Sequence, residues 1–124
     1  MKITFRKLTA LLVLLASAST AWAEPVWIDV RTTEEFAVDH IDGDVNIPLA
    51  ELDAAALATQ YGKDAEIALY CRSGNRAGQA EALLEAAGFT QVSNAGGIGD
   101  VRELRKIAAA AASSASDVPS PDSR

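Results

Sequence analysis

Short strand-like segments alternate with helix-like segments along most of this chain, and this alternation restricts the possible folds more than any other feature. Four short segments are predicted as strands, at residues 26–30, 45–47, 66–70 and 90–93, and the first is rich in β-branched and aromatic residues. Helical patterns lie between and after them, at residues 32–39, 50–60, 76–87 and 100–111. Because the connections are short, the pattern predicts an α/β fold: a short parallel sheet flanked by helices on both faces.

Local signals support several of these boundaries. Thr32 and Glu35 have the spacing of a capping box, which is typical of a helix start. Gly62 and Gly88 follow the second and third helical patterns, where glycine commonly ends a helix. The Gly96-Gly97 pair predicts a turn before the last helix.

The first 23 residues have the three parts of a secretory signal peptide: a positive start, an apolar middle and small residues before a cleavage point. The parts are Lys2, Arg6 and Lys7, then residues 8–16, then Ala21 and Ala23. The apolar part is shorter than the roughly 20 residues that span a bilayer, so we expect cleavage rather than a membrane anchor. The prediction is an exported, soluble protein, most simply periplasmic, with one domain at residues 24–111 and a disordered low-complexity tail at residues 112–124.

The charge of the expected mature chain limits its partners. All 17 acidic residues but only eight of the 11 basic ones follow position 23, which gives a net charge of −9. Such a surface lacks the clustered Lys and Arg that bind phosphates, so we expect no nucleic-acid partner. The single cysteine, Cys71, excludes an intramolecular disulfide.

Cys71 directly follows the third predicted strand and precedes a helix. In a parallel α/β sheet, ligands bind at the carboxyl ends of strands, and the first amides of a helix have no partners within it. Gly74 lets the connection curl, and Arg72 and Arg76 add positive charge. These features predict a lowered thiol pKa and a nucleophilic thiolate that needs no histidine base. The alternative, a buried inert cysteine, explains neither the arginines nor the glycine.

The chain resembles the rhodanese domains, sulfurtransferases that carry sulfur as a persulfide on one cysteine, and especially their small exported single-domain members. Four groups of residues carry the resemblance, in the family's order: residues 27–31, residues 35–36 with 40–48, residues 70–76, and residues 88–89 with 94–97. Two departures, at Ala77 and after the glycine pair, leave the cysteine loop itself unchanged. Four residues separate Cys71 from Arg76, whereas related phosphatases have five, so the smaller loop favours a sulfur atom over a phosphate ester.

The resemblance implies a thiosulfate sulfurtransferase in which Cys71 takes sulfur from thiosulfate and passes it to cyanide or a thiol. It implies no metal and no organic cofactor. The expected substrate-binding residues are those of the loop after the cysteine: Arg72, Ser73, Gly74, Asn75 and Arg76. A non-catalytic sulfur carrier or partner-binding module remains the alternative function, and the oligomeric state is left open.

Other polar residues have structural interpretations. Asp29 lies within an apolar strand and needs a partner, so we expect it to pair with Arg31 and support the site. His40, the only histidine, is expected to make a structural hydrogen bond rather than a dyad with Cys71. Asp39, Asp42 and Asp44 lack the spacing of a calcium loop, which indicates a solvated turn.

Overall fold

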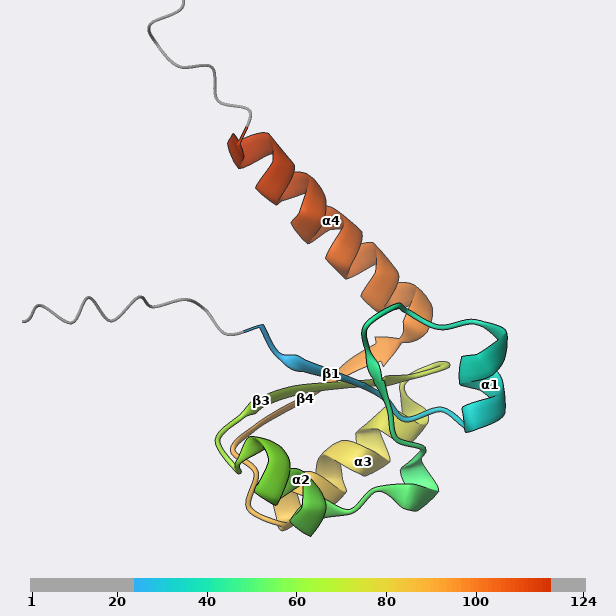
Figure 1. The fold of residues 1–124 in the computed structure, drawn as a ribbon, viewed down its shortest axis with the longest axis vertical. Helices are drawn as coiled ribbons and strands as arrows, with labels where there is room; N and C mark the ends of the chain where they lie inside the picture. Colours follow the sequence, from blue (N-terminus) through green and yellow to red (C-terminus); the bar gives the residue numbers. More distant parts are fainter. Residues whose placement is uncertain (1–23, 117–124) are drawn as a thin grey trace, which may run out of the picture.

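The computed structural model describes residues 24–116, which form one four-stranded parallel sheet with helices around it (Figure 1). The strands are β1 (Val26–Asp29), β2 (Val45–Asn46), β3 (Glu66–Cys71) and β4 (Gln91–Gly97), in the spatial order β2-β1-β3-β4. Residues 1–23, the predicted export signal, and residues 117–124 lie outside the described part. The parallel α/β architecture predicted from the alternation is confirmed.

Helices fill the connections between strands. They are α1 (Thr33–Val38), a 3₁₀ turn η1 (Leu49–Glu51), α2 (Ala54–Tyr61), α3 (Asn75–Ala86) and α4 (Ile98–Ser116). Figure 1 shows α2 and α3 on one side of the sheet, α1 beside the carboxyl end of β1, and α4 leaving from the side opposite α3. Thr32 caps α1 with the predicted capping box, because its hydroxyl accepts from Glu35 N–H at 3.2 Å while Glu35 accepts from Thr32 N–H.

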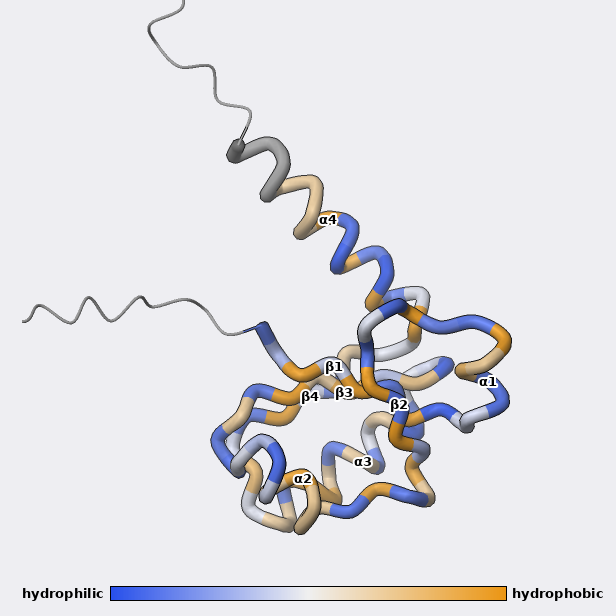
Figure 2. Tube along the Cα trace, in the orientation of Figure 1, coloured by the Kyte–Doolittle hydropathy of each residue, from blue (hydrophilic) through white to orange (hydrophobic). Residues whose placement is uncertain are grey.

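The hydrophobic core lies between the sheet and the α2–α3 layer. The buried residues of this cluster are Ile28, Val30, Leu57, Ile67, Leu69, Cys71, Ala77, Ala80, Leu84 and Phe89. Burying a large aliphatic side chain stabilises the fold by about 1.5–3 kcal/mol, so these few residues hold the strands and α3 together. The hydropathy colouring follows this pattern, with apolar residues concentrated along the strands (Figure 2). Cys71 therefore sits at the rim of the core rather than on an open surface.

One predicted helix is divided in two. The segment predicted as a helix over residues 50–60 forms η1 and then, after a break at Leu52 and Asp53, α2. Asp53 causes the break, since its carboxylate accepts a hydrogen bond from Ala56 N–H at 3.1 Å and caps a new helix. The amphipathic pattern located the helical region but not the cap inside it.

The end of the domain differs more from the prediction. Gly96 and Gly97 belong to β4 and α4 begins at once with Ile98, so the predicted turn is wrong. The helix then passes its predicted end near Ala111 and continues to Ser116. Alanine is the strongest helix former, and the alanine run at residues 108–112 continues the helix. Within residues 24–116, the structure contains no helix that is both long and apolar enough for a bilayer span.

Candidate active site at Cys71

Cys71 ends β3 with its side chain on the same face as Ile67 and Leu69, which pack in the core. The residue is only 1% exposed, and its sulfur lies under the connection to α3. The N–H of Gly74 donates to Cys71 Sγ at 2.9 Å. We call residues 71–76 the Cys71 loop. The predicted position of the cysteine, at the carboxyl end of a parallel strand, matches the structure.

Backbone amides control the charge state of the thiol. Burial opposes ionisation of Cys71, but hydrogen bonds from the N–H groups of Ala77, Ser73, Gly74 and Arg76 outweigh it and lower the pKa of the thiol. Among residues 24–111, the Gly74 N–H is the donor with hydrogen-bond geometry to Cys71 Sγ, at 2.9 Å, in a site almost closed to solvent. The lowered pKa that the sequence predicted agrees with this arrangement, and the thiolate is the reactive form of cysteine.

Two glycines give the Cys71 loop its shape. Gly74 precedes α3 in the left-handed conformation, with φ of +95°, which other residues rarely adopt. Gly97 lies against the loop from β4: a Cβ atom there would come within 2.5 Å of the carbonyl oxygen of Arg72. The end of β4 thus packs directly against the loop, and a side chain at Gly97 would displace it.

The two arginines of the loop have different surroundings. Arg76 is paired with Glu35 of α1, at 2.7 Å from Nη1 to Oε1 and 3.1 Å from Nη2 to Oε2. The Arg76 guanidinium lowers the pKa of the Glu35 carboxyl to about 2, so the pair is charged on both sides at neutral pH. Arg72 is exposed, and its guanidinium has no hydrogen-bond or ion-pair partner among residues 24–111. Of the two predicted anion-attracting side chains, Arg72 carries the charge that is not already compensated.

The remaining loop positions contribute unequally. Ser73 is exposed and supplies its amide to the sulfur, whereas the Asn75 side chain accepts a hydrogen bond from Gln79 at 3.1 Å along α3. Ala77, one residue beyond the predicted site, is fully buried and its amide also reaches the sulfur. Sequence reasoning treated Ala77 only as a departure from the family pattern, although its place in the first turn of α3 could have indicated the free amide.

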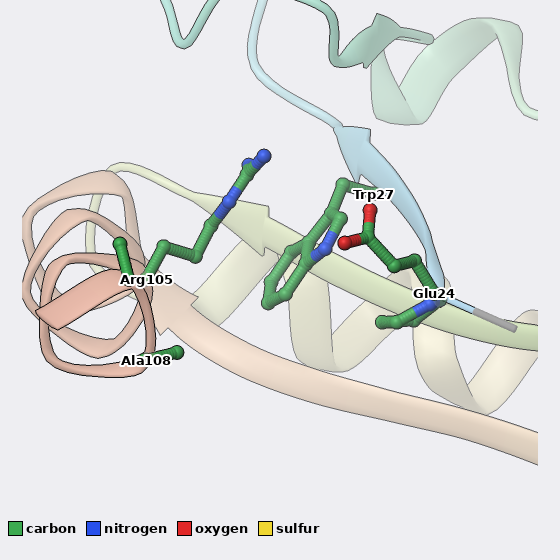
Figure 3. Close-up of a pocket in the computed structure, with 6 residues that line it drawn as sticks. Glu24, Trp27, Arg105 and Ala108 are labelled. Atoms are coloured by element: carbon green, nitrogen blue, oxygen red, sulfur yellow. The ribbon is translucent and has the colours of Figure 1, made fainter. Parts of the chain in front are cut away.

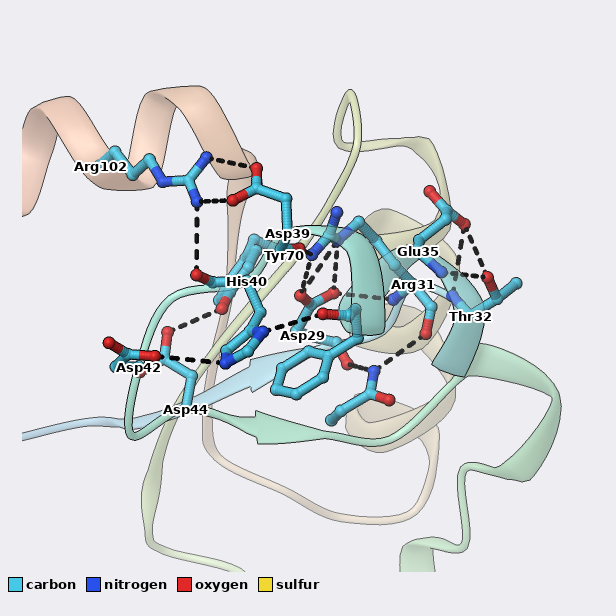
Figure 4. Close-up of polar contacts among 12 residues, drawn as sticks. Asp29, Arg31, Thr32, Glu35, Asp39, His40, Asp42, Asp44, Tyr70 and Arg102 are labelled. Atoms are coloured by element: carbon cyan, nitrogen blue, oxygen red, sulfur yellow. Dashed lines mark hydrogen bonds and ion pairs between the residues drawn. The ribbon is translucent and has the colours of Figure 1, made fainter.

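A buried ion pair lies beside the site on β1. The Arg31 guanidinium donates to both carboxylate oxygens of Asp29, at 2.8–3.0 Å, and the Arg31 N–H donates to the same carboxylate at 2.9 Å (Figure 4). Arg31 also donates to the carbonyl of Asp39 at 2.6 Å. Asp29 is fully buried and Arg31 nearly so, and the pairing predicted for them is present. It ties the end of β1 to the end of α1.

The ring of His40 contacts only nearby residues among those the structure describes, while its backbone carbonyl accepts from Arg102 at 3.4 Å. Its Nδ1 lies 2.9 Å from the carbonyl of Phe36, its Nε2 lies 3.2 Å from Asp42, and its ring stacks on Phe36. Both ring nitrogens thus have partners near α1, and among the described residues no hydrogen bond joins His40 to Cys71. This arrangement agrees with the structural interpretation of His40.

The three aspartates after α1 are not uniformly solvated, which corrects one expectation. Asp39 pairs with Arg102 of α4 at 2.7 Å, and Asp44, whose side chain is only 4% exposed, accepts from Tyr70 at 2.7 Å and from Arg105 at 2.8 Å. Only Asp42 is fully exposed. Asp44 is buried because Arg105 and Tyr70 compensate its charge, and neither partner is close to it in the sequence. No cluster of potential metal ligands occurs among the described residues.

A second surface feature lies beside β1 and α4. Arg105 lies 5.0 Å over the ring of Trp27, at the wall of a shallow pocket of about 370 Å³ (Figure 3). Glu24, Pro25, Ala108 and Ala109 complete the lining. The pocket contains no nucleophile and lies on the Tyr70 face of β3, away from Cys71.

Comparison with known proteins identifies the family. Residues 14–103 match the family described as Rhodanese-like domain. This chain belongs to the rhodanese-like family. Its relatives include proteins named as sulfurtransferases.

Individual relatives support the same assignment. The chain is 39% identical over 75 residues to thiosulfate sulfurtransferase PspE of Escherichia coli K12, covering 60% of this chain and 72% of that protein. It is 37% identical over 67 residues to the putative sulfur carrier protein YrkF of Bacillus subtilis, covering 54% of this chain but only 35% of that one. A solved E. coli structure described as rhodanese with anions matches with a TM-score of 0.56 and 40% identity, over 62% of this chain and 91% of that chain.

Proposed function

We propose that this rhodanese-like domain is a thiosulfate sulfurtransferase that carries sulfur as a persulfide on Cys71. The observation that carries the proposal is a buried cysteine whose sulfur accepts the Gly74 N–H at 2.9 Å and whose pKa is lowered by backbone N–H donors. Such donors stabilise a negative sulfur whether it belongs to the thiolate or to the terminal atom of a persulfide. The identity to PspE of E. coli supports thiosulfate as the donor.

In the first half-reaction, the Cys71 thiolate attacks the outer sulfur of thiosulfate. A bond forms between Cys71 Sγ and that sulfur, the S–S bond within thiosulfate breaks, and its electron pair leaves with sulfite. The products are an enzyme persulfide and sulfite, with atoms and charge conserved. Arg72 is placed to attract the dianionic donor, because its charge is exposed and lacks a partner among residues 24–111.

In the second half-reaction, cyanide or a thiolate attacks the terminal sulfur of the persulfide. The Cys71 Sγ takes back the electron pair of the S–S bond and returns to the thiolate, while the acceptor leaves as thiocyanate or as a persulfide. A covalent intermediate of this kind gives ping-pong kinetics. No step needs a general base, which is consistent with the local contacts of His40.

The loop also favours sulfur over a phosphate ester. Four residues separate Cys71 from Arg76, and the Arg76 guanidinium is already bound by Glu35 in a two-point ion pair. A phosphate would need a wider ring of amides and a guanidinium available to its oxygens. The signal-peptide pattern of residues 1–23 further leads us to propose export to the periplasm, where the domain would act.

The test measures turnover and the covalent intermediate together. Purified protein and Cys71→Ser are assayed for thiocyanate formation from thiosulfate and cyanide, and intact masses are taken after thiosulfate alone. We expect turnover only in the unsubstituted protein, with an added mass of about 32 Da from one sulfur. A loaded protein without turnover would indicate the sulfur-carrier function instead, and equal turnover by Cys71→Ser would refute the persulfide route.

A further inference from the structure

Asn94 of β4 makes two hydrogen bonds that join the Cys71 loop to the end of β4. Its Nδ2 donates to the carbonyl of Gly74 at 2.9 Å, and its Oδ1 accepts from the N–H of Gly96 at 2.9 Å. A carbonyl can only accept and a backbone N–H can only donate, so only this orientation of the carboxamide satisfies both groups. The side chain is exposed, so its two hydrogen bonds are not a by-product of core packing.

Gly74 is the residue through which Asn94 is connected to the sulfur. Its N–H donates to Cys71 Sγ at 2.9 Å, while its carbonyl accepts from Asn94 and from Gly78 N–H at 3.0 Å. Glycine has the widest range of backbone conformations, and Gly74 stands in the left-handed region. Holding the carbonyl therefore restricts the direction in which the N–H of the same residue points.

The other end of Asn94 is itself anchored. Gly96 precedes Gly97, which packs against the Arg72 carbonyl and donates its N–H to Asp100 at 2.9 Å. Space for the carboxamide is provided by Gly78, where a Cβ atom would come within 3.3 Å of Asn94 Nδ2. Asn94 thus connects Gly74 of the Cys71 loop to the part of β4 that packs against the loop.

We propose that Asn94 is a positioning residue for Cys71: it holds the Gly74 carbonyl so that the Gly74 N–H stays aimed at the sulfur. That Asn94 positions the Gly74 N–H toward the Cys71 thiolate rests on geometry alone. That it also helps to stabilise a Cys71 persulfide rests on the proposed sulfurtransferase function. Asn94 makes no hydrogen bond to the sulfur among the described residues and acts through Gly74.

Asn94→Ala removes both hydrogen bonds and tests the proposal through the thiol itself. The rate of alkylation of Cys71 by iodoacetamide is measured across pH, and the rate of persulfide loading from thiosulfate is followed by mass. We expect the midpoint of the alkylation profile to move to higher pH and loading at pH 7 to slow by about threefold to tenfold, since a hydrogen bond to a charged group is weakened. Asn94→Ala leaves the charged side chains around the loop unchanged: Glu35, Arg72, Arg76 and Asp100.

Ser93→Ala is the matched control. Ser93 is the neighbouring exposed residue of β4, and its hydroxyl has no hydrogen-bond partner among residues 24–111. We expect its alkylation profile and loading rate to equal those of the unsubstituted protein. Thermal unfolding of both variants shows whether a change in reactivity comes from the loop or from a loss of folded protein.

Asn94→Asp separates the two hydrogen bonds. Aspartate can still accept from Gly96 N–H, but it cannot donate to the Gly74 carbonyl, and its charge opposes the thiolate. We expect a larger upward shift of the alkylation midpoint than in Asn94→Ala. If the alkylation midpoint is unchanged in both Asn94→Ala and Asn94→Asp, the proposal is overturned. If the unsubstituted protein fails to load sulfur while the alkylation midpoints still shift, the sulfurtransferase proposal fails and the positioning role of Asn94 stands.

Discussion

Tyr70 and Cys71 are adjacent in β3, yet the pKa of the Tyr70 hydroxyl is raised and the pKa of the Cys71 thiol is lowered. Tyr70 faces the α4 side, where burial and then the hydrogen bond to Asp44 raise the pKa of its hydroxyl far above the usual value. Cys71 faces the α3 side, where burial also opposes ionisation but four backbone amides outweigh it and lower the pKa of the thiol. The pKa values of two neighbouring residues on one strand are thus shifted in opposite directions.

The difference teaches that burial alone does not decide ionisation. Both groups lose water, which disfavours charge on each of them. Asp44 brings a negative charge to Tyr70, whereas the Cys71 sulfur meets the positive ends of N–H dipoles. Because alternate residues of a strand point to opposite faces, the sheet separates these two environments. The comparison predicts that the two faces can be changed independently.

We expect Gly97→Ala to have the largest effect, by displacing the Cys71 loop and slowing its reaction with thiosulfate. The added Cβ would lie 2.5 Å from the Arg72 carbonyl, so the loop must move and its amides lose their aim at the sulfur. Displacements of about 1 Å in a reacting geometry can reduce rates by about 100-fold, and we expect a loss of this size in sulfur loading from thiosulfate. Intact-mass kinetics provide the measurement.

Gly99→Ala is the control for that substitution. Gly99 lies in the first turn of α4, and a Cβ there meets nothing within 4 Å. We expect unchanged loading and a gain in stability of about 0.4–1 kcal/mol, because alanine restricts the unfolded chain. Normal loading by Gly97→Ala, or equal losses in both variants, would contradict the account of β4 as the support of the loop.

Tyr70→Phe should lower stability through the Tyr70 face of the sheet and leave the Cys71 face unchanged. The loss of a buried hydrogen bond to a carboxylate is expected to lower the free energy of unfolding by about 1–2 kcal/mol. A raised pKa in the folded state means that this stability is present below the ordinary tyrosine pKa of about 10 and is lost as pH rises above it. Denaturant unfolding from pH 7 to 11 should therefore show a steeper alkaline loss in the unsubstituted protein.

The same variant tests the independence of the two faces. The alkylation midpoint of Cys71 should be identical in Tyr70→Phe and in the unsubstituted protein, and in both it should lie below that of a free thiol such as glutathione. A shifted midpoint in Tyr70→Phe would show that the sheet does not separate the two environments.

Glu35→Gln should have the smallest effect. The ion pair with Arg76 is partly exposed, so its loss should lower stability by less than about 1 kcal/mol at neutral pH. The pKa of Glu35 is lowered to about 2, so the pair stabilises the fold above the ordinary glutamate pKa of about 4.3 and this contribution is lost as pH falls toward 2. The stability difference between variant and unsubstituted protein should shrink over that range, and a difference that stays constant with pH would refute the assignment.

Much of the site was predictable because it is local. Cys71, Gly74 and the first turn of α3 are close in sequence, and the strand-loop-helix pattern places free amides next to the cysteine. The pairing of Asp29 with Arg31 was predictable for the same reason, since an Asp in an apolar strand needs a nearby cation. Ala77 was missed because its contribution is a backbone N–H, which leaves no trace in the side chain.

The contacts between distant segments were not predictable. Glu35 was expected only as a helix cap, yet it also binds Arg76 across the site. Asp44 was expected in solvent, yet Tyr70 and Arg105 bury it. The glycine pair was expected to form a turn, yet Gly97 ends β4 beneath the loop. Each partner lies too far along the chain for spacing to reveal the contact.

The sequence by itself determined the α/β class, the family and the place of Cys71 at a strand end, because strand and helix periods and a strand-loop-helix motif are properties of neighbouring residues. Only the tertiary structure decided which charges compensate one another and which backbone supports the loop. Arg76 is neutralised by α1, Arg72 is left without a partner among residues 24–111, and Asn94 of β4 holds Gly74. Electrostatic balance and steric support depend on distances in space, which the order of residues along the chain does not specify.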